Sequence, residues 1–458
     1  MNSRFNIQSS RLYRFMFVLL ASQMMLIPIA AQNGPTQQNL TGTPGTFAIT
    51  NARIVTVSGA TIPNGTIVIS DGKIASVGAN VSVPGGATRI DGTGLSVYPG
   101  MIDAGTNMGL QEIGNAVIGT VDVAETGNFN PNAKAILGLN PHTSHINVTR
   151  VNGITMAHSM PRGSLIAGQS AIVNLNGSSQ DEMTVVPTFG LVISFPRIST
   201  FAGFNPRTGP RRIDFSQAVK RRDTRVKNLK DIFERAKRYA SVKAAAAKDN
   251  SLPTPKTNLK MEAMIPYVGG EKPIVFSAER ARDIRGVIKF VEEMKLKAII
   301  YGGAEAWKEV DGLKKNNIPV IYNRIHSNPS NRDDPYDANF ESPSKLQKAG
   351  VRFCISTGNN GANVRELPYQ AGLASAYGLS KDDALKSVTL YPAQILGVDK
   401  MVGSIEVGKV ANIVVTDGDI LEVRTRIKHM FITGRKIPLT SRHTEFFEAF
   451  KDRKLKSK

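Results

Sequence analysis

Short apolar runs alternate with polar or amphipathic segments along most of the chain. Near the start, strands are predicted over residues 48–58, 66–70 and 74–77, and the pair Asp71-Gly72 between the last two is typical of a two-residue hairpin. Three strands of this size bury too little apolar surface to form a stable domain by themselves. We therefore expect strands from another part of the chain to complete their sheet.

The C-terminal part of the chain offers the missing strands. Residues 411–416 and 426–433 are apolar and strand-like, with glycine turns beside them. The two ends of the chain are therefore predicted to build one small β-sandwich, from residues 47–98 and 401–440.

Between these ends, residues 99–400 alternate apolar strand-like runs with helical segments. This alternation is typical of parallel strands covered by helices, and the length suits a (β/α)8 barrel, so the predicted fold class is α/β. The apolar runs are residues 154–158, 170–176, 191–195, 273–277, 298–301, 319–322 and 351–356.

The first residues have the pattern of a targeting signal. Three arginines precede an apolar run at residues 15–29, and the small residues Ala30 and Ala31 follow it. This order predicts a cleaved signal peptide at residues 1–31, with a polar linker at 32–46. An uncleaved anchor is the alternative, although the apolar run is short for a membrane span. We therefore expect an exported protein, periplasmic or extracellular, with no stable membrane span after signal cleavage.

Positive charge is concentrated in one part of the chain. The formal net charge is +20, and 17 Lys and Arg stand against 5 Asp and Glu between Arg197 and Lys260. The segment has few aromatic residues and no DNA-binding motif, so no nucleic-acid partner is predicted. A solvated helical insertion at about residues 197–260 explains the charge better, and binding to an anionic membrane surface is the weaker hypothesis. The charged tail, 441–458, is predicted to be a short peripheral helix.

Motifs at both ends of the chain resemble those of the imidazolonepropionase-like members of the amidohydrolase superfamily, and the resemblance covers nearly all of the chain after the signal. The fold that it implies is a distorted (β/α)8 TIM-like barrel inserted into a composite β-sandwich made from both chain ends. The runs that carry the resemblance are residues 49–54, 67–74, 77–78, 98–104, 378–380, 392–393, 396–397, 403–406, 408–409 and 411–412.

The resemblance also implies a reaction. Members of this family hydrolyse C–N bonds, often in cyclic amides or dipeptides, with one or two divalent metals such as Zn at the mouth of the barrel. A bound metal lowers the pKa of water and supplies hydroxide near neutral pH. The family provides a His-x-His pair after the first strand, a His on each of strands five and six, and an Asp on strand eight.

This sequence replaces each of those ligands. Glycines have no side chain, and neutral Asn and Ser are weak ligands, so we predict that no metal cofactor is bound and that hydrolysis is impaired. A lysine on strand four, which some members use, has no counterpart that the sequence can place. The replaced ligand positions are Gly105, Asn107, Ser277, Gly302 and Gly358.

Other residues are candidates for a rearranged site. His158 and His326 each follow an apolar strand, at the end where a barrel carries its active site. With Glu279 and Asn107 nearby, either histidine is suited to general acid–base catalysis. Hydrogen-bonded loop histidines without a catalytic role are the alternative interpretation.

Amide side chains suggest a binding function. Asn359 and Asn360 lie in a glycine- and asparagine-rich loop, and together with Asn107 they are candidates for contacting a neutral polar ligand. A turn-rich connection without a ligand is the alternative. His142 and His145 are three residues apart on one predicted helical turn, but no third zinc ligand accompanies them.

Two functional hypotheses follow, and the missing ligands leave open whether the chain is an enzyme. In the first, the protein keeps the fold and its cavity but lacks metal-dependent hydrolysis. It then binds a small molecule or supports a partner, as a homo-oligomer or as a hetero-oligomer with a metal-competent amidohydrolase. In the second, it is an active hydrolase of C–N bonds whose rearranged site uses His158 or His326.

Overall fold

Two compact units make up the chain, and each is described by itself. The larger runs from Gln38 to Ser441, and the smaller combines Met1–Gln37 with Arg442–Lys458. In the smaller unit the charged tail forms helix α13 (Arg442–Phe450). The computed structural model describes residues 41–112, 118–163, 165–358 and 361–453, so the predicted signal peptide at 1–31 and the loop residues Asn359 and Asn360 lie outside the described residues.

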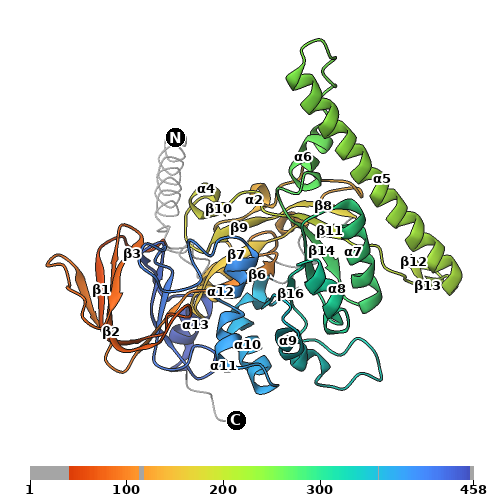
Figure 1. The fold of residues 1–458 in the computed structure, drawn as a ribbon. Helices are drawn as coiled ribbons and strands as arrows, with labels where there is room; N and C mark the ends of the chain where they lie inside the picture. The colour runs from red at the N-terminus through yellow and green to blue at the C-terminus, as the bar shows by residue number, and fades with distance from the viewer. Residues whose placement is uncertain (1–40, 113–117, 164, 359–360, 454–458) are drawn as a thin grey trace, which may run out of the picture. The chain divides into compact units, whose positions relative to one another are not determined.

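Strands from both ends of the chain pair in one eight-stranded sheet (Figure 1). Strand β1 (Phe47–Ile54) pairs antiparallel with β2 (Ile62–Ser70) and parallel with β5 (Ser96–Pro99). The C-terminal strand β18 (Ile413–Thr416) then pairs antiparallel with β5. The remaining strands of this composite sheet are β3 (Lys73–Gly78), β4 (Thr88–Asp91), β19 (Ile427–Ile432) and β20 (Arg435–Lys436).

Local sequence signals account for this sheet. Asp71 and Gly72 join β2 to β3 with φ of 51° and 76°, so both residues have the positive φ that a type I′ hairpin turn requires. Ile67 of β2 and Ile413 of β18 belong to the same buried cluster. Each end of the chain therefore supplies a share of the core that neither could bury by itself.

The barrel strands follow in chain order. Strand β6 (Met101–Thr106) pairs parallel with β7 (Ile154–Ser159), and the next strand is split at Ser170 into β8 (Ile166–Gln169) and β9 (Ala171–Asn174). β9 pairs antiparallel with β7, while β8 pairs antiparallel with β11 (Leu191–Ser194). Parallel pairs then lead through β14 (Ile274–Ala278), β15 (Ala298–Gly302), β16 (Val320–Tyr322) and β17 (Phe353–Ile355).

Side chains connect the last strand to the first. Ser356, which follows β17, places its hydroxyl oxygen 2.5 Å from Asp103 Oδ1 and 2.8 Å from Gly105 O on β6. The predicted distorted barrel, inserted into a sandwich made from both chain ends, is confirmed. Its distortion includes the antiparallel strand formed by β8 and β9.

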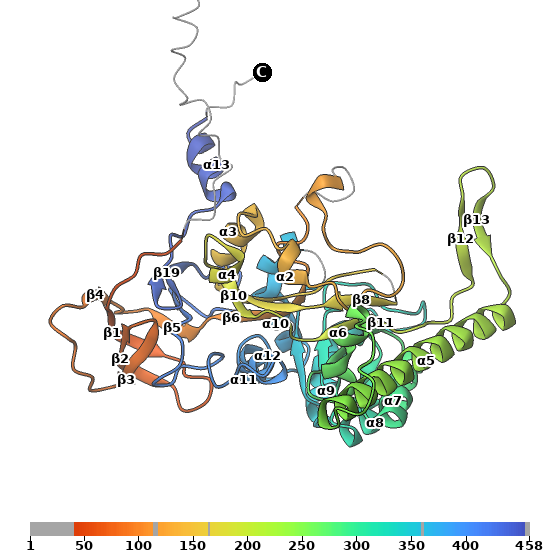
Figure 2. The same cartoon turned by 90° about the horizontal axis from the view of Figure 1, so that it is seen from above.

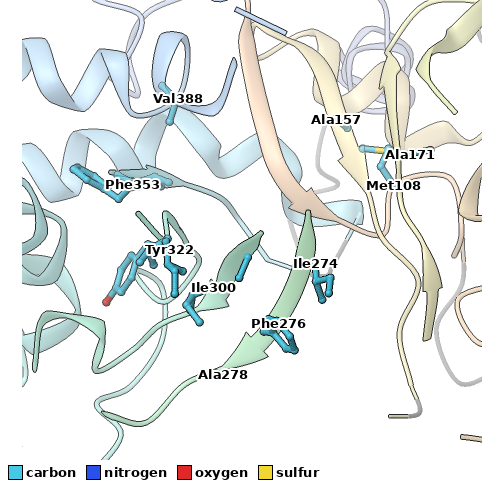
Figure 3. Close-up of a cluster of buried hydrophobic side chains, with 14 of the residues drawn as sticks. Met108, Ala157, Ala171, Ile274, Phe276, Ala278, Ile300, Tyr322, Phe353 and Val388 are labelled. Carbon is cyan, nitrogen blue, oxygen red and sulfur yellow. The ribbon is translucent and has the colours of Figure 1, made fainter. Parts of the chain in front are cut away.

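Both faces of the barrel strands are buried. Ile299, Ile321 and Cys354 belong to the cluster inside the barrel, whereas Ile300 and Val320 pack with the surrounding helices. Figure 3 shows part of this outer cluster, with Phe276, Ile300 and Tyr322 from three neighbouring strands. Strands buried on both sides are expected to be almost continuously apolar, which is why their sequences were recognisable.

Helices cover the outer face, and no helix in the described ranges is long and apolar enough to cross a membrane. Among them, α7 (Ala281–Met294) contacts β14 and α9 (Ala338–Lys348) contacts β17, while α8 (Val310–Lys315) contacts α7. The others are α2 (Ala135–Gly138), α3 (Ser144–Arg150), α4 (Gln180–Met183), α6 (Leu259–Val268), α10 (Leu367–Ala376), α11 (Lys381–Lys386) and α12 (Leu390–Ile395). Shorter elements are β10 (Thr184–Val186) and the 3-10 turns η2 (Ile118–Thr120), η3 (Ala306–Lys308) and η4 (Gly361–Glu366).

The basic insertion contains a long helix, as predicted, but begins with strands that were not. β12 (Phe201–Asn205) and β13 (Gly209–Arg212) form a separate two-stranded sheet. Helix α5 (Phe215–Lys248) follows, and Asp214 caps it by accepting a hydrogen bond from Gln217 N at 2.8 Å. Figure 2 shows the hairpin and the start of α5 extending away from the barrel strands.

Candidate functional site at the C-terminal ends of the barrel strands

Tyr301 occupies the space beside Gly105, the first replaced ligand position. A Cβ atom placed on Gly105 would lie 2.4 Å from Tyr301 Cε2 and 3.2 Å from Met160 Cε, well inside ordinary carbon contact distances. The Tyr301 ring is buried, and its hydroxyl group donates to Gly105 O at 3.4 Å. A histidine at position 105 is therefore incompatible with this position of Tyr301.

Asn107, the second position of the replaced His-x-His pair, is engaged in local structure. Its Oδ1 accepts a hydrogen bond from Gly361 N at 2.8 Å, and its Nδ2 donates to Gln111 Oε1 at 2.9 Å. The side chain is buried. The amide that we considered for ligand contact therefore holds two loops together.

The three remaining positions also present no metal-binding group. A Cβ atom on Gly302 would lie 2.6 Å from Glu279 Oε1, and among the described residues a Cβ atom on Gly358 would lie closest to the Asn323 side chain, at 3.7 Å. Ser277 is half-buried at the end of β14. Among the residues that the structure describes, no three His, Cys, Asp or Glu are grouped so that they could hold a metal ion. The side chains at these five positions do not fit the metal of the family.

Asp103 is a buried carboxyl group that the sequence did not single out. It accepts hydrogen bonds from Gly105 N at 3.0 Å, from Thr357 N at 3.2 Å and from the hydroxyl groups of Ser356 and Thr357. Burial raises its pKa to about 6, while these hydrogen bonds act in the opposite direction. The available signal was a single Asp inside the apolar first strand of the barrel.

His158 lies within β7 and has both ring nitrogens engaged. Nδ1 donates to Ala104 O at 2.7 Å, since a carbonyl oxygen can only accept, and Nε2 then accepts from the Ser170 hydroxyl group at 2.7 Å. The ring is fully buried with an edge contact to Phe189, and burial lowers its pKa to about 4. This environment favours a neutral histidine with a structural role.

His326 is placed differently, beside a cavity of about 770 Å³ that Glu279 also lines. Its Nδ1 is 3.4 Å from Glu366 Oε2, and the pair is partly exposed. Glu279 lies 3.8 Å from Arg324 Nε and accepts from Ala304 N at 3.3 Å, while burial raises its pKa. The structure therefore brings His326 and Glu279 to one cavity.

A second cavity of about 710 Å³, which we call the arginine cavity, lies at the ends of β11 and β14. Among the described residues, Arg197, Arg225 and Arg280 form no ion pair, and all three line it. Its two acidic residues form ion pairs with other arginines, Asp283 with Arg282 and Glu279 with Arg324, each at 3.8 Å, while Arg197 acts on both carboxylates from beyond ion-pair distance. Arginines outnumber carboxylates on the cavity wall, and such an excess favours carboxylate or phosphate groups in a ligand.

Comparison with known proteins agrees with this architecture. A sequence profile described as the amidohydrolase family matches residues 313–457. The structure of an amidohydrolase from Thermotoga maritima MSB8 is similar with a TM-score of 0.74 and 27% identity, over 86% of this chain and 99% of that one. A prolidase complexed with N-methylphosphonate-L-proline has a TM-score of 0.51 and 15% identity over 86% and 99% of the two chains, which bears on the fold alone.

One curated relative also matches, the amidohydrolase tasK of Hapsidospora irregularis. It is 21% identical over 402 residues, which include 81% of this chain. The chain spans only 39% of the length of that relative.

Proposed function

We propose that the chain, whose sequence and fold match those of amidohydrolases, keeps the barrel and a ligand cavity but performs no metal-dependent hydrolysis of C–N bonds. The observation that carries the proposal is the Tyr301 ring beside Gly105, where a Cβ atom would be 2.4 Å from the ring. A lost ligand can leave an open site, but here a buried side chain fills the space. The neutral replacements Asn107 and Ser277 point in the same direction.

The arginine cavity supports binding of an anionic small molecule. Arg197, Arg225 and Arg280 come from three different elements, and their guanidinium groups form no ion pair among the described residues. Ser277 adds a neutral hydrogen-bonding group to the wall. A ligand with a carboxylate or phosphate group would satisfy these donors in the bidentate manner that arginine favours.

A second candidate function is metal-independent hydrolysis of a C–N bond at the other cavity. The observation in its favour is the His326–Glu366 pair at 3.4 Å, with Glu279 on the wall of the same cavity. A histidine held by a carboxylate can act as a general base. His158 is not part of this candidate, because both of its nitrogens are engaged inside the barrel.

Hydrolysis assays on cyclic amides and dipeptides separate these functions. We expect no turnover, with or without added Zn or Mn. Turnover that a chelator abolishes would contradict the main proposal. Turnover that survives the chelator but is lost in His326→Ala would establish the second candidate, and His443→Ala is the matched control because His443 is an exposed histidine of α13.

Export is a further part of the proposal, supported by the arginines and the apolar run of residues 15–29. N-terminal sequencing of the chain recovered outside the cytoplasm should begin near Gln32. Recovery of only the intact chain beginning at Met1 would contradict signal cleavage.

A partner role is the last part of the proposal. The chain would form a homo-oligomer, or a hetero-oligomer with a metal-competent amidohydrolase. The replaced metal ligands support this role, since a barrel without them needs no substrate turnover of its own to stabilise a partner. Light scattering of the purified chain, with and without such a relative, tests it, and a mass of one chain in both samples would contradict it.

A further inference from the structure

We propose that the hairpin β12–β13 and the start of α5 dock on an anionic lipid surface. We call this segment, residues 201–227, the basic arm. Its hairpin pairs with no other strand in the described part of the chain. A lone two-stranded hairpin is marginally stable in water, so it gains from a surface to pack against.

The arm exposes three phenylalanines. Phe201 is 54% exposed, Phe204 is 68% exposed and Phe215, at the first position of α5, is 61% exposed. Single apolar residues on a protein surface are ordinary, but three bulky rings within fifteen residues form a group. Such a group marks a surface that makes contact with something else.

A bulge places two of these rings on one face of the hairpin. Phe201 lies opposite Arg212 and Phe204 lies opposite Pro210, with a register shift between Phe201 and Gly203. Residues directly opposite each other share a face, and Arg212 and Pro210 are two apart on a regular strand. Phe201 and Phe204 therefore share a face, which residues three apart in an unbulged strand would not.

The same segment is strongly basic. Residues 201–227 contain 8 Lys and Arg and 2 Asp and Glu. Arg207, Arg211 and Arg212 of the hairpin form no ion pair among the described residues. Aromatic rings that enter the headgroup region beside arginines that contact phosphates are typical of interfacial membrane binding.

The shape of the arm favours a lipid surface over other partners. A two-stranded hairpin offers little surface to an acidic protein, whereas two rings that share one face can enter a headgroup region together. Nucleic acid is the alternative partner for the basic residues, and the vesicle and DNA arms of the experiment below separate the two. The rings Phe201 and Phe215 also line the arginine cavity, so docking would hold that cavity close to the lipid surface.

Tryptophan fluorescence of the full chain tests the proposal at the hairpin itself. The natural chain has one tryptophan, Trp307, which serves as the background signal. In Phe204→Trp we expect a blue shift on adding phosphatidylcholine vesicles that contain phosphatidylglycerol, and none with phosphatidylcholine alone. Adding Arg211→Gln and Arg212→Gln to this variant should weaken the response about tenfold or more, because each basic residue strengthens contact with an anionic surface.

Three outcomes would overturn the proposal. They are no shift with anionic vesicles, an equal shift with both vesicle types, and a shift with duplex DNA in place of vesicles. Vesicle flotation provides a second measurement of binding. The Phe201→Ser/Phe204→Ser variant should bind anionic vesicles less than the natural chain, whereas the exposed matched control Val423→Ser should bind them equally. Both phenylalanines are exposed, so the variants should keep their fold, and the apolar run at residues 15–29 is common to all of them.

Discussion

Gly105 shows how a single residue decides what the barrel can hold. Its lack of a side chain lets the Tyr301 ring reach the first strand and places the Tyr301 hydroxyl group 3.4 Å from Gly105 O. Burial raises the pKa of Tyr301, so the phenol stays protonated and remains a donor. The packing of the glycine and the tyrosine is therefore coupled, and a change of side chain at one position alters the packing at the other.

Gly105→Ala should destabilise the fold by about 1–3 kcal/mol, because the added methyl group meets the buried Tyr301 ring. The backbone of Gly105 has no positive φ, so the effect reports the contact rather than backbone strain. Chemical denaturation measures it. Gly86→Ala is the control, since nothing lies within 4 Å of a Cβ atom there. Equal stabilities of the two variants would contradict this account of Tyr301.

Asp103 should make stability depend on pH in a specific direction. Its pKa is about 6 in the folded chain against an ordinary value of 3.8, so the folded state holds the proton more tightly. The stability that it contributes is full below about pH 4 and is lost as the pH rises through 6, by an amount on the order of 3 kcal/mol. Asp103→Asn cannot ionise.

Denaturation of Asp103→Asn and the natural chain from pH 4 to pH 7 checks this sign. The free energy of unfolding of the natural chain should exceed that of the variant by the largest amount near pH 4 and by a smaller amount at pH 7. Only the natural chain loses stability as Asp103 ionises. His158 titrates alike in both, so its effect cancels. A gap that widens with rising pH would mean that hydrogen bonds from Ser356 and Thr357 outweigh burial.

At the scale of elements, the arginine cavity is assembled by parts distant in the sequence. Arg197 follows β11, Arg280 follows β14 and Arg225 lies on α5. Nothing in the sequence distinguishes these arginines from the others. Only the parallel pairing of β11 with β14 brings the first two together.

Replacing Arg197 and Arg280 by Gln should therefore weaken binding of anionic ligands. We expect citrate and inorganic phosphate to raise the melting temperature of the natural chain, and at least about tenfold more ligand to be needed in the double variant, since charge-assisted hydrogen bonds are lost. Arg332→Gln, an exposed arginine outside both cavities, is the charge control. Equal responses in the control and the double variant would exclude the cavity as the binding site.

Elements with strong local signals were predictable, and those that depend on distant contacts were not. The Asp71-Gly72 turn and the apolar strands β14 to β17 were recognisable because their signals lie within a few residues. The hairpin β12–β13 was missed, since Phe201–Asn205 and Gly209–Arg212 carry neither a continuous apolar run nor a regular alternation. The antiparallel direction of β8 and β9 has no local signal at all.

The candidate site divides in the same way. Gly105 and Asn107 were assigned as replaced ligand positions from the motif of residues 98–104, while Ser277, Gly302 and Gly358 were assigned from the ends of predicted strands. Contacts between residues far apart in the chain place Tyr301 beside Gly105 and engage both ring nitrogens of His158. Sequence could therefore indicate which positions lack the expected ligands, but not which side chains surround those positions.

For the molecule as a whole, the similarity to amidohydrolases extends to the fold but not to the residues at the expected metal-ligand positions. The barrel and the composite sheet join both ends of the chain, and the match to the Thermotoga maritima amidohydrolase covers 86% of it. The five positions where the resemblance places metal ligands, in contrast, hold three glycines, an asparagine and a serine. The central claim is that this combination binds no catalytic metal.

Metal analysis of the purified chain tests that claim most directly. After expression with added Zn and Mn and removal of loosely bound ions, we predict far less than about one metal ion per chain, and a melting temperature that a chelator leaves unchanged. The measurement should include His142→Ala/His145→Ala, which removes the two histidines that stand three residues apart near the start of α3. About one Zn or Mn per chain, retained in that variant and stabilising the fold, would contradict the claim.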